Sequence, residues 1–181
     1  LYRRGFFRFS AIGCREREGV EICRGLGFAA THVVDPTLLI EAPRWLKLAG
    51  RAVSPSGRTC NRVLVCYFLS VDLEDIWLDL DRFAVSQNCR VEVLSNSANL
   101  RPWGRFGARS NKGRVRICRE YGPREFVRAF ASATWVLTDS FHAVRFSAIL
   151  GCDMRFVRPT SADRMGMFAR IEEFAKECII G

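Results

Sequence analysis

One of the two histidines, His142, lies in the stretch TDSFHAVRFSAIL, residues 138–150, where an apolar run passes into a helical apolar pattern. Asp139 and Ser140 are residue types that cap helices, and the first-turn N–H groups of a helix bind anions such as phosphate or carboxylate. His142 would lie in that first turn, close enough to exchange a proton with a bound anion. A histidine that only hydrogen-bonds a neighbouring loop explains the same residues, so both interpretations stay open here.

A second junction of this kind involves the segment CRERE, which places Arg15 between an apolar segment and a helical pattern. The planar guanidinium of arginine binds carboxylates and phosphates through paired hydrogen bonds. The sequence therefore predicts two corners suited to anions, and two halves facing each other would form a cleft from them. The other histidine, His32, is interpreted as structural, and Asp35-Pro36 as a turn that ends a strand.

Alternating strand and helix patterns must position these residues. The expected strands are 6–14, 30–34, 62–70, 90–94, 134–138 and 154–158. The expected helices are 16–26, 73–86, 122–133, one from Phe141, and 167–178, and residues 95–112 are expected to be a long loop. Alternation of this kind predicts an α/β fold with a parallel sheet, in which ligands collect beyond the carboxyl ends of the strands.

The pattern weakens between residues 38 and 59, where prolines and a glycine interrupt it. We therefore expect residues 1–40 to be the end of one Rossmann-like domain, 41–60 an interdomain linker, and 61–181 a second Rossmann-like domain with a closing helix. The chain starts without methionine and stops after an amphipathic pattern, so we expect it to be a segment of a longer protein.

Composition narrows the class of protein. Apolar residues make up 49% and charged residues 26%, as in soluble globular proteins, and no apolar run reaches the roughly 20 residues that cross a bilayer. We expect a cytoplasmic protein without a transmembrane segment. Eight cysteines are scattered singly and no His/Cys/Asp/Glu cluster has ligand spacing, so neither a disulfide framework nor a metal site is expected.

The net charge is +9, and 25 of the 28 basic residues are arginine because Lys47, Lys112 and Lys176 are the only lysines. The arginines are dispersed, and no aromatic RNA-binding pattern or helix-turn-helix signature occurs. We therefore predict no nucleic-acid partner. An anionic small molecule or polymer fits this charge, as does a solvated surface rich in arginine.

Five segments, taken in order, resemble the polysaccharide pyruvyl transferase family. They are SAIGCREREGVEICRGLGF (10–28), VVDPTLLI (33–40), RVLVCYFL (62–69), YGPREFVRAFASATWVLTDSFHAVRFSAILG (121–151) and SADRM (161–165). The resemblance implies a GT-B-like architecture of two Rossmann-like domains with the active site between them, of which the N-terminal part is missing here. On that basis the fragment alone is expected to be inactive.

The same resemblance implies bacterial exopolysaccharide biosynthesis, in which a pyruvyl group passes from phosphoenolpyruvate to sugar hydroxyls as a ketal. Phosphoenolpyruvate would be a co-substrate, with no further cofactor. The acceptor would be a glycan or a lipid-linked sugar, which leaves peripheral membrane association open. The sequence fixes neither the acceptor sugar nor the oligomeric state.

Site residues follow from the resemblance position by position. His142 matches the general acid, Arg15 and Arg164 match arginines that bind the anionic donor, and Ser140 and Phe141 would shape the pocket wall and supply helix-end donors. The family pattern SFHGTVFS departs here to SFHAVRFS, residues 140–147. Arg145 would lie one turn beyond His142, where it could compensate for the lost glycine and threonine or face solvent.

Three alternatives stay open. A GT-B glycosyltransferase would use a nucleotide sugar on the same fold. A non-catalytic basic module would bind its partner with an affinity that falls steeply with salt and is indifferent to His142. The altered SFHAVRFS segment also fits an inactive relative of the family.

Overall fold

The computed structural model describes residues 2–50, 62–69, 73–94 and 113–157, and the chain divides into two compact units, Leu1–Ile40 and Glu41–Gly181. The predictions for Arg164, the loop 95–112 and the helix 167–178 concern residues outside the described ranges. Within the described residues, no helix is long and apolar enough to span a membrane.

The first unit holds helix α1 (Tyr2–Phe6), strand β1 (Gly13–Cys14), helix α2 (Arg17–Gly25), strand β2 (Thr31–His32) and the 3-10 helix η1 (Pro36–Leu39). β1 and β2 pair in parallel, with Cys14 opposite His32. The strand expected over 6–14 is wrong in all but its last two residues. Phe6 instead ends α1, where its ring packs on that of Phe28 with centroids 5.4 Å apart.

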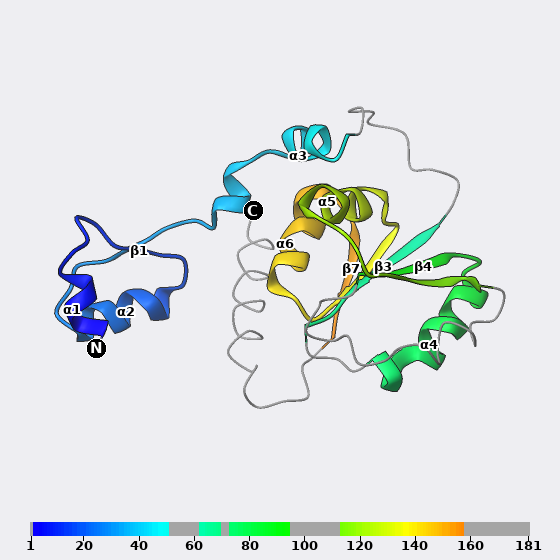
Figure 1. Ribbon diagram of the computed structural model, residues 1–181, viewed down its shortest axis with the longest axis horizontal. Helices are drawn as coiled ribbons and strands as arrows, with labels where there is room; N and C mark the ends of the chain where they lie inside the picture. Colours follow the sequence, from blue (N-terminus) through cyan, green and yellow to red (C-terminus); the bar gives the residue numbers. More distant parts are fainter. Residues whose placement is uncertain (1, 51–61, 70–72, 95–112, 158–181) are drawn as a thin grey trace. The chain divides into compact units, whose positions relative to one another are not determined.

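The second unit is built on a five-stranded parallel sheet with strand order β5-β4-β3-β6-β7 (Figure 1). The strands are β3 (Val63–Tyr67), β4 (Arg90–Leu94), β5 (Val115–Cys118), β6 (Trp135–Thr138) and β7 (Asp153–Phe156). The predicted α/β class with a Rossmann-like parallel sheet is confirmed. Because the chain builds outward from β3 in both directions, the order reverses between β3 and β6, where such sheets bind ligands.

Helices cover both faces of this sheet (Figure 1). Helix α4 (Leu73–Ser86) packs Trp77 and Leu80 on one face, against Leu64, Cys66 and Val91. Helices α5 (Pro123–Ser132) and α6 (Phe141–Leu150) pack on the other face, where Phe130 and Phe146 meet Val63 and Val65. Each strand of the centre is therefore buried on both sides, which explains its nearly continuous apolar sequence.

Helix α3 (Ala42–Leu48) belongs to this second unit. The ring of Trp45 packs edge-on against Phe146 at 4.9 Å, and Arg128 of α5 donates its Nε–H to the carbonyl of Ala49 at 2.9 Å. The expected linker 41–60 therefore begins with an ordered helix, and residues 51–61 lie outside the described part.

Strand β5 is absent from the sequence-based expectation. Its residues, VRIC, follow Arg114 and contain Arg116, so polar side chains break the apolar run. Among the strands that the structure describes, β5 pairs only with β4 and forms an edge of the sheet, and the side chain of Arg116 is exposed there. An edge strand needs no continuous apolar sequence, which is why its pattern is weak.

Candidate functional site

The carboxyl ends of β3 and β6 are tied together at the point where the strand order reverses. Tyr67 and Thr138 lie opposite each other in the register. The buried hydroxyl of Thr138 donates to the carbonyl oxygen of Tyr67 and accepts the N–H of Ser140 at 3.0 Å. One side chain thus holds the end of β3 and the turn that leads into α6.

Asp139 adds a second tie across the same junction. Its carboxylate is fully buried, and Oδ1 accepts the N–H of Leu69, just after β3, at 2.6 Å. The sequence left Asp139 and Ser140 as alternative caps of α6. Ser140 is the residue at the N-cap position, and its side chain makes no capping hydrogen bond. The Asp139 carboxylate therefore fixes the loop that follows β3.

His142 lies on the first turn of α6 with its side chain exposed, as the sequence predicts for its position in the helix. The residues around it are buried: Phe141, Ala143 and Val144 all face the core. An exposed imidazole on an otherwise buried turn is accessible to a ligand at the carboxyl edge of the sheet.

The residues that depart from the family pattern face inward. Ala143 and Val144 pack in the core, and Arg145 is also buried, with its guanidinium carbon 4.1 Å from the centre of the Phe141 ring. The alternative in which Arg145 faces solvent is wrong. Phe141 and Ser140 are likewise buried, so these two side chains support the first turn of α6 from inside.

Two tyrosines that the sequence analysis did not single out lie near this junction. The hydroxyls of Tyr67 and Tyr121 share a hydrogen bond, and both rings pack on Phe126. Burial raises the pKa of Tyr121 to about 12, and burial also raises the pKa of Tyr67, helped by the negative charge of Asp139. Both phenols therefore keep their protons at neutral pH and can donate hydrogen bonds.

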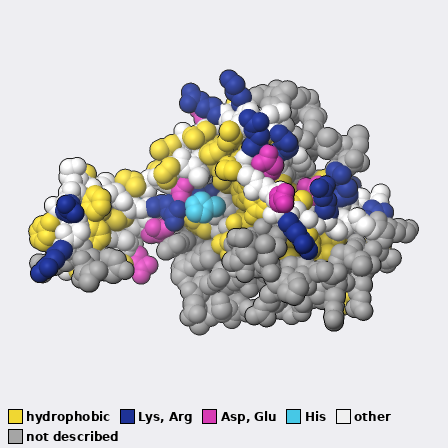
Figure 2. Space-filling view, viewed as in Figure 1, with side chains coloured by type: hydrophobic (Ala, Val, Ile, Leu, Met, Phe, Trp, Pro, Cys, Tyr) yellow, Lys and Arg dark blue, Asp and Glu magenta, His cyan; other side chains and the backbone are white. Residues whose placement is uncertain are grey.

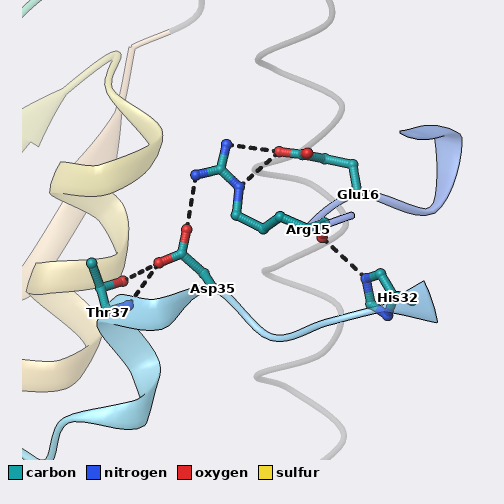
Figure 3. A network of polar contacts seen from close by, with 5 residues as sticks. All are labelled: Arg15, Glu16, His32, Asp35 and Thr37. Atoms are coloured by element: carbon teal, nitrogen blue, oxygen red, sulfur yellow. Dashed lines mark hydrogen bonds and ion pairs between the residues drawn. The ribbon is translucent and has the colours of Figure 1, made fainter. Parts of the chain in front are cut away.

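The second predicted corner, at Arg15 in the first unit, contains an ion-pair network (Figure 3). Nη1 of Arg15 lies 2.9 Å from Oδ2 of Asp35, while Nη2 and Nε lie 2.8 and 2.9 Å from Oε1 of Glu16. The guanidinium side chain remains 28% exposed. The sequence predicted Arg15 and missed its two carboxylate partners, because Asp35 is twenty residues away.

Asp35 and His32 complete the network. The Asp35 carboxylate accepts the N–H and the hydroxyl of Thr37 through Oδ1, which makes it the N-cap of η1, as the predicted turn requires. Nε2 of His32 lies 3.1 Å from the carbonyl oxygen of Arg15. Because a carbonyl can only accept, Nε2 carries the proton, and His32 holds the backbone beside Arg15 in the structural role expected of it.

On the face shown in Figure 2, acidic and apolar side chains separate the basic side chains of the described residues. Among the residues that the structure describes, no group of three or more His, Cys, Asp or Glu side chains is arranged to hold a metal ion.

These observations define a class of protein. The strand order, with its reversal between β3 and β6, is that of a Rossmann-like α/β domain. The profile of the polysaccharide pyruvyl transferase family matches residues 1–159, and the chain belongs to this family.

Comparisons with other proteins are more distant. No curated protein sequence matches the chain significantly. Among solved structures, it is similar to a Listeria monocytogenes protein assigned as a UDP-N-acetylglucosamine 2-epimerase, with 15% identity and a TM-score of 0.47 over 70% of this chain and 33% of that one. It is also similar to the E. coli heptosyltransferase WaaC, with 13% identity and a TM-score of 0.48 over 82% and 49% of the two chains. The chain spans less than half the length of both.

Replacing Thr138 by valine is expected to lower the free energy of unfolding by about 2 kcal/mol, because the methyl group leaves the Tyr67 carbonyl and the Ser140 N–H without their partner. Urea unfolding of the intact protein measures this change. Thr138→Ser keeps the hydroxyl and is the matched control. A Thr138→Val protein as stable as the Thr138→Ser protein would show that the tie contributes nothing.

Proposed function

We propose that the protein transfers a pyruvyl group from phosphoenolpyruvate to the hydroxyls of a sugar in a polysaccharide or its lipid-linked precursor. Membership of the pyruvyl transferase family supports the class of reaction. The observation that carries the proposal is the exposed imidazole of His142 on the first turn of α6, beyond the reversal of strand order. No cofactor other than the donor is required.

The chemistry calls for an acid. In the proposed reaction His142 gives a proton to the methylene carbon of phosphoenolpyruvate, and the adjacent carbon becomes an oxocarbenium-like centre. A sugar hydroxyl adds to that centre and passes its proton back to the histidine. A second hydroxyl of the sugar then displaces the phosphate, which leaves as inorganic phosphate and takes the proton of that hydroxyl, and the product is a cyclic ketal.

The donor carries a phosphate and a carboxylate, so its binding needs cationic groups and N–H donors. We propose that Arg15 binds one of these anionic groups and that the positive end of the α6 dipole favours negative charge beside His142. Arg164 is proposed for the same task, from the family resemblance. Tyr67 and Tyr121, both neutral, lie near the carboxyl end of β3, where their hydroxyls can donate hydrogen bonds.

Arg15→Ala is expected to raise the dissociation constant of phosphoenolpyruvate about 10-fold, since one charge-assisted contact is lost. Isothermal titration calorimetry on the intact protein measures it. Arg82→Ala is the matched control, because it removes the same charge from an arginine whose side chain is 78% exposed on α4. An equal effect of both substitutions would mean that only net charge matters.

The same titration separates the other candidate functions. Binding of a nucleotide sugar without binding of phosphoenolpyruvate would replace the proposal with a glycosyltransferase. Polyanion binding that falls steeply with salt and ignores His142→Ala would indicate a basic interaction module. Donor binding without any transfer would identify an inactive relative.

A further inference from the structure

We propose that Asp35 is a positioning residue that holds Arg15 for the anionic donor, and that Glu16 is the exchangeable partner that the donor displaces. This inference rests on the proposed function, in which Arg15 binds phosphoenolpyruvate. Three observations carry it: the burial of the two carboxylates, the geometry of their contacts with the guanidinium, and the net charge of the cluster (Figure 3).

Asp35 is a fixed partner. Its side chain is only 2% exposed, one carboxylate oxygen accepts two hydrogen bonds from Thr37, and the other lies 2.9 Å from Nη1 of Arg15. Both oxygens are therefore engaged. A carboxylate so far removed from water needs its cation, so separating this pair costs more than separating a surface pair. The contact fixes one end of the guanidinium.

Glu16 is a loosely held partner. Its side chain is 25% exposed, it neighbours Arg15 in the chain, and a single oxygen, Oε1, contacts both Nε and Nη2. Exposed ion pairs are weak because water and salt screen them. A phosphate or carboxylate presents two oxygens to the same Nε–Nη2 edge in the geometry that guanidinium groups prefer. The donor is therefore better suited to this edge than Glu16.

Charge makes the exchange necessary. One arginine and two carboxylates leave the Arg15–Glu16–Asp35 cluster with a net charge of −1, which repels an anionic ligand. Release of Glu16 from the guanidinium removes the competing carboxylate, whereas release of Asp35 would separate a buried carboxylate from the guanidinium that lies 2.9 Å from it. The donor consequently exchanges with Glu16 and leaves the Asp35 contact intact.

Matched neutral substitutions test this difference. Simple electrostatics predicts that Asp35→Asn and Glu16→Gln, which each remove one negative charge, both tighten phosphoenolpyruvate binding. If Asp35 positions Arg15, the two substitutions change the affinity for phosphoenolpyruvate in opposite directions. We expect about 10-fold weaker binding for Asp35→Asn, whose side chain can still cap η1, and about 3-fold tighter binding for Glu16→Gln. Calorimetry on the intact protein measures both. Tighter binding by both variants would overturn the role of Asp35, and weaker binding by Glu16→Gln would overturn the exchange.

A double-substitution cycle shows whether Asp35 acts through Arg15. In an Arg15→Lys background, which lacks the planar fork, Asp35→Asn is expected to change the dissociation constant by less than 2-fold. An undiminished 10-fold effect in that background would contradict positioning. If Asp35→Asn fails to fold, Thr37→Val offers a second test, because it removes the hydroxyl that donates to the Asp35 carboxylate. We expect about 2-fold weaker phosphoenolpyruvate binding in this variant. Unchanged binding would contradict the positioning role of Asp35.

A readout without ligand keeps this inference separate from the proposed function. In ¹⁵N-labelled protein the Nε–Hε order parameter of Arg15, assigned with Arg15→Lys, is expected to fall to values typical of mobile groups, below about 0.6, in Asp35→Asn and to fall less in Glu16→Gln. If the parent does not bind phosphoenolpyruvate, the proposed function fails, and this measurement still decides whether Asp35 holds Arg15. Equal order parameters in parent and Asp35→Asn would overturn it.

Discussion

His142→Ala is expected to lower the turnover of pyruvyl transfer about 10²–10⁴-fold while the dissociation constant of phosphoenolpyruvate changes only a few-fold. The reason is the position of the imidazole, which is exposed on the first turn of α6 and lies away from the apolar core. Removing it takes away a proton donor without creating a cavity. Single-turnover kinetics of the intact protein, with calorimetry of donor binding alongside, measures both quantities.

Two controls separate proton transfer from damage to the helix. His142→Gln keeps a polar side chain of similar size but cannot exchange a proton, so it should be as slow as His142→Ala. Added imidazole should restore part of the turnover to His142→Ala, because the position is open to solvent. The urea midpoint should stay that of the parent. Turnover within 10-fold of the parent in both variants would contradict the role of His142 as the acid.

The local periodicity of apolar residues was sufficient to predict most helices and strands of the second unit. The helices α4, α5 and α6 and the strands β3, β4 and β6 lie within a few residues of their predicted positions, because their apolar residues repeat at the spacing of a helix or form a continuous strand. The place of His142 at a strand-to-helix junction follows from the same pattern. The prediction failed for β5, which was not expected, and for the strand expected over 6–14. In these two segments arginines or clustered aromatic residues obscure the alternation of apolar and polar residues.

Contacts between distant residues could not be predicted in this way. The bond between Asp139 and the Leu69 N–H joins positions seventy residues apart, and the ion pair of Arg15 with Asp35 spans twenty. A hydrophobic pattern carries no information about which polar groups pair across a fold. The sequence therefore allowed Asp139 to be a helix cap and Asp35 to be only a turn residue. The structure gives each carboxylate a partner that its own segment does not contain.

Asp139→Ala is expected to lower the free energy of unfolding by about 3 kcal/mol, because a buried acceptor is lost and the Leu69 N–H at the end of β3 loses its charged partner. Turnover should also fall, by about 10²-fold, since Asp139 precedes the N-cap residue of α6 and a displacement of about 1 Å at a catalytic group has an effect of that order. Urea unfolding and single-turnover kinetics of the intact protein measure the two effects.

The matched control is Asp139→Asn, whose side-chain oxygen can still accept the Leu69 N–H. We expect it to lose less than half as much stability as Asp139→Ala and to keep most of its turnover. The reason is that the hydrogen bond to the Leu69 N–H holds the junction, whereas the carboxylate itself does not react. Kinetics must be compared where all three proteins are fully folded. If Asp139→Asn were as slow as Asp139→Ala despite near-parental stability, the negative charge of Asp139 would take part in the chemistry, and the purely structural account of this junction would fail. If Asp139→Ala kept full turnover, the position of His142 would not depend on the tie between β3 and β6.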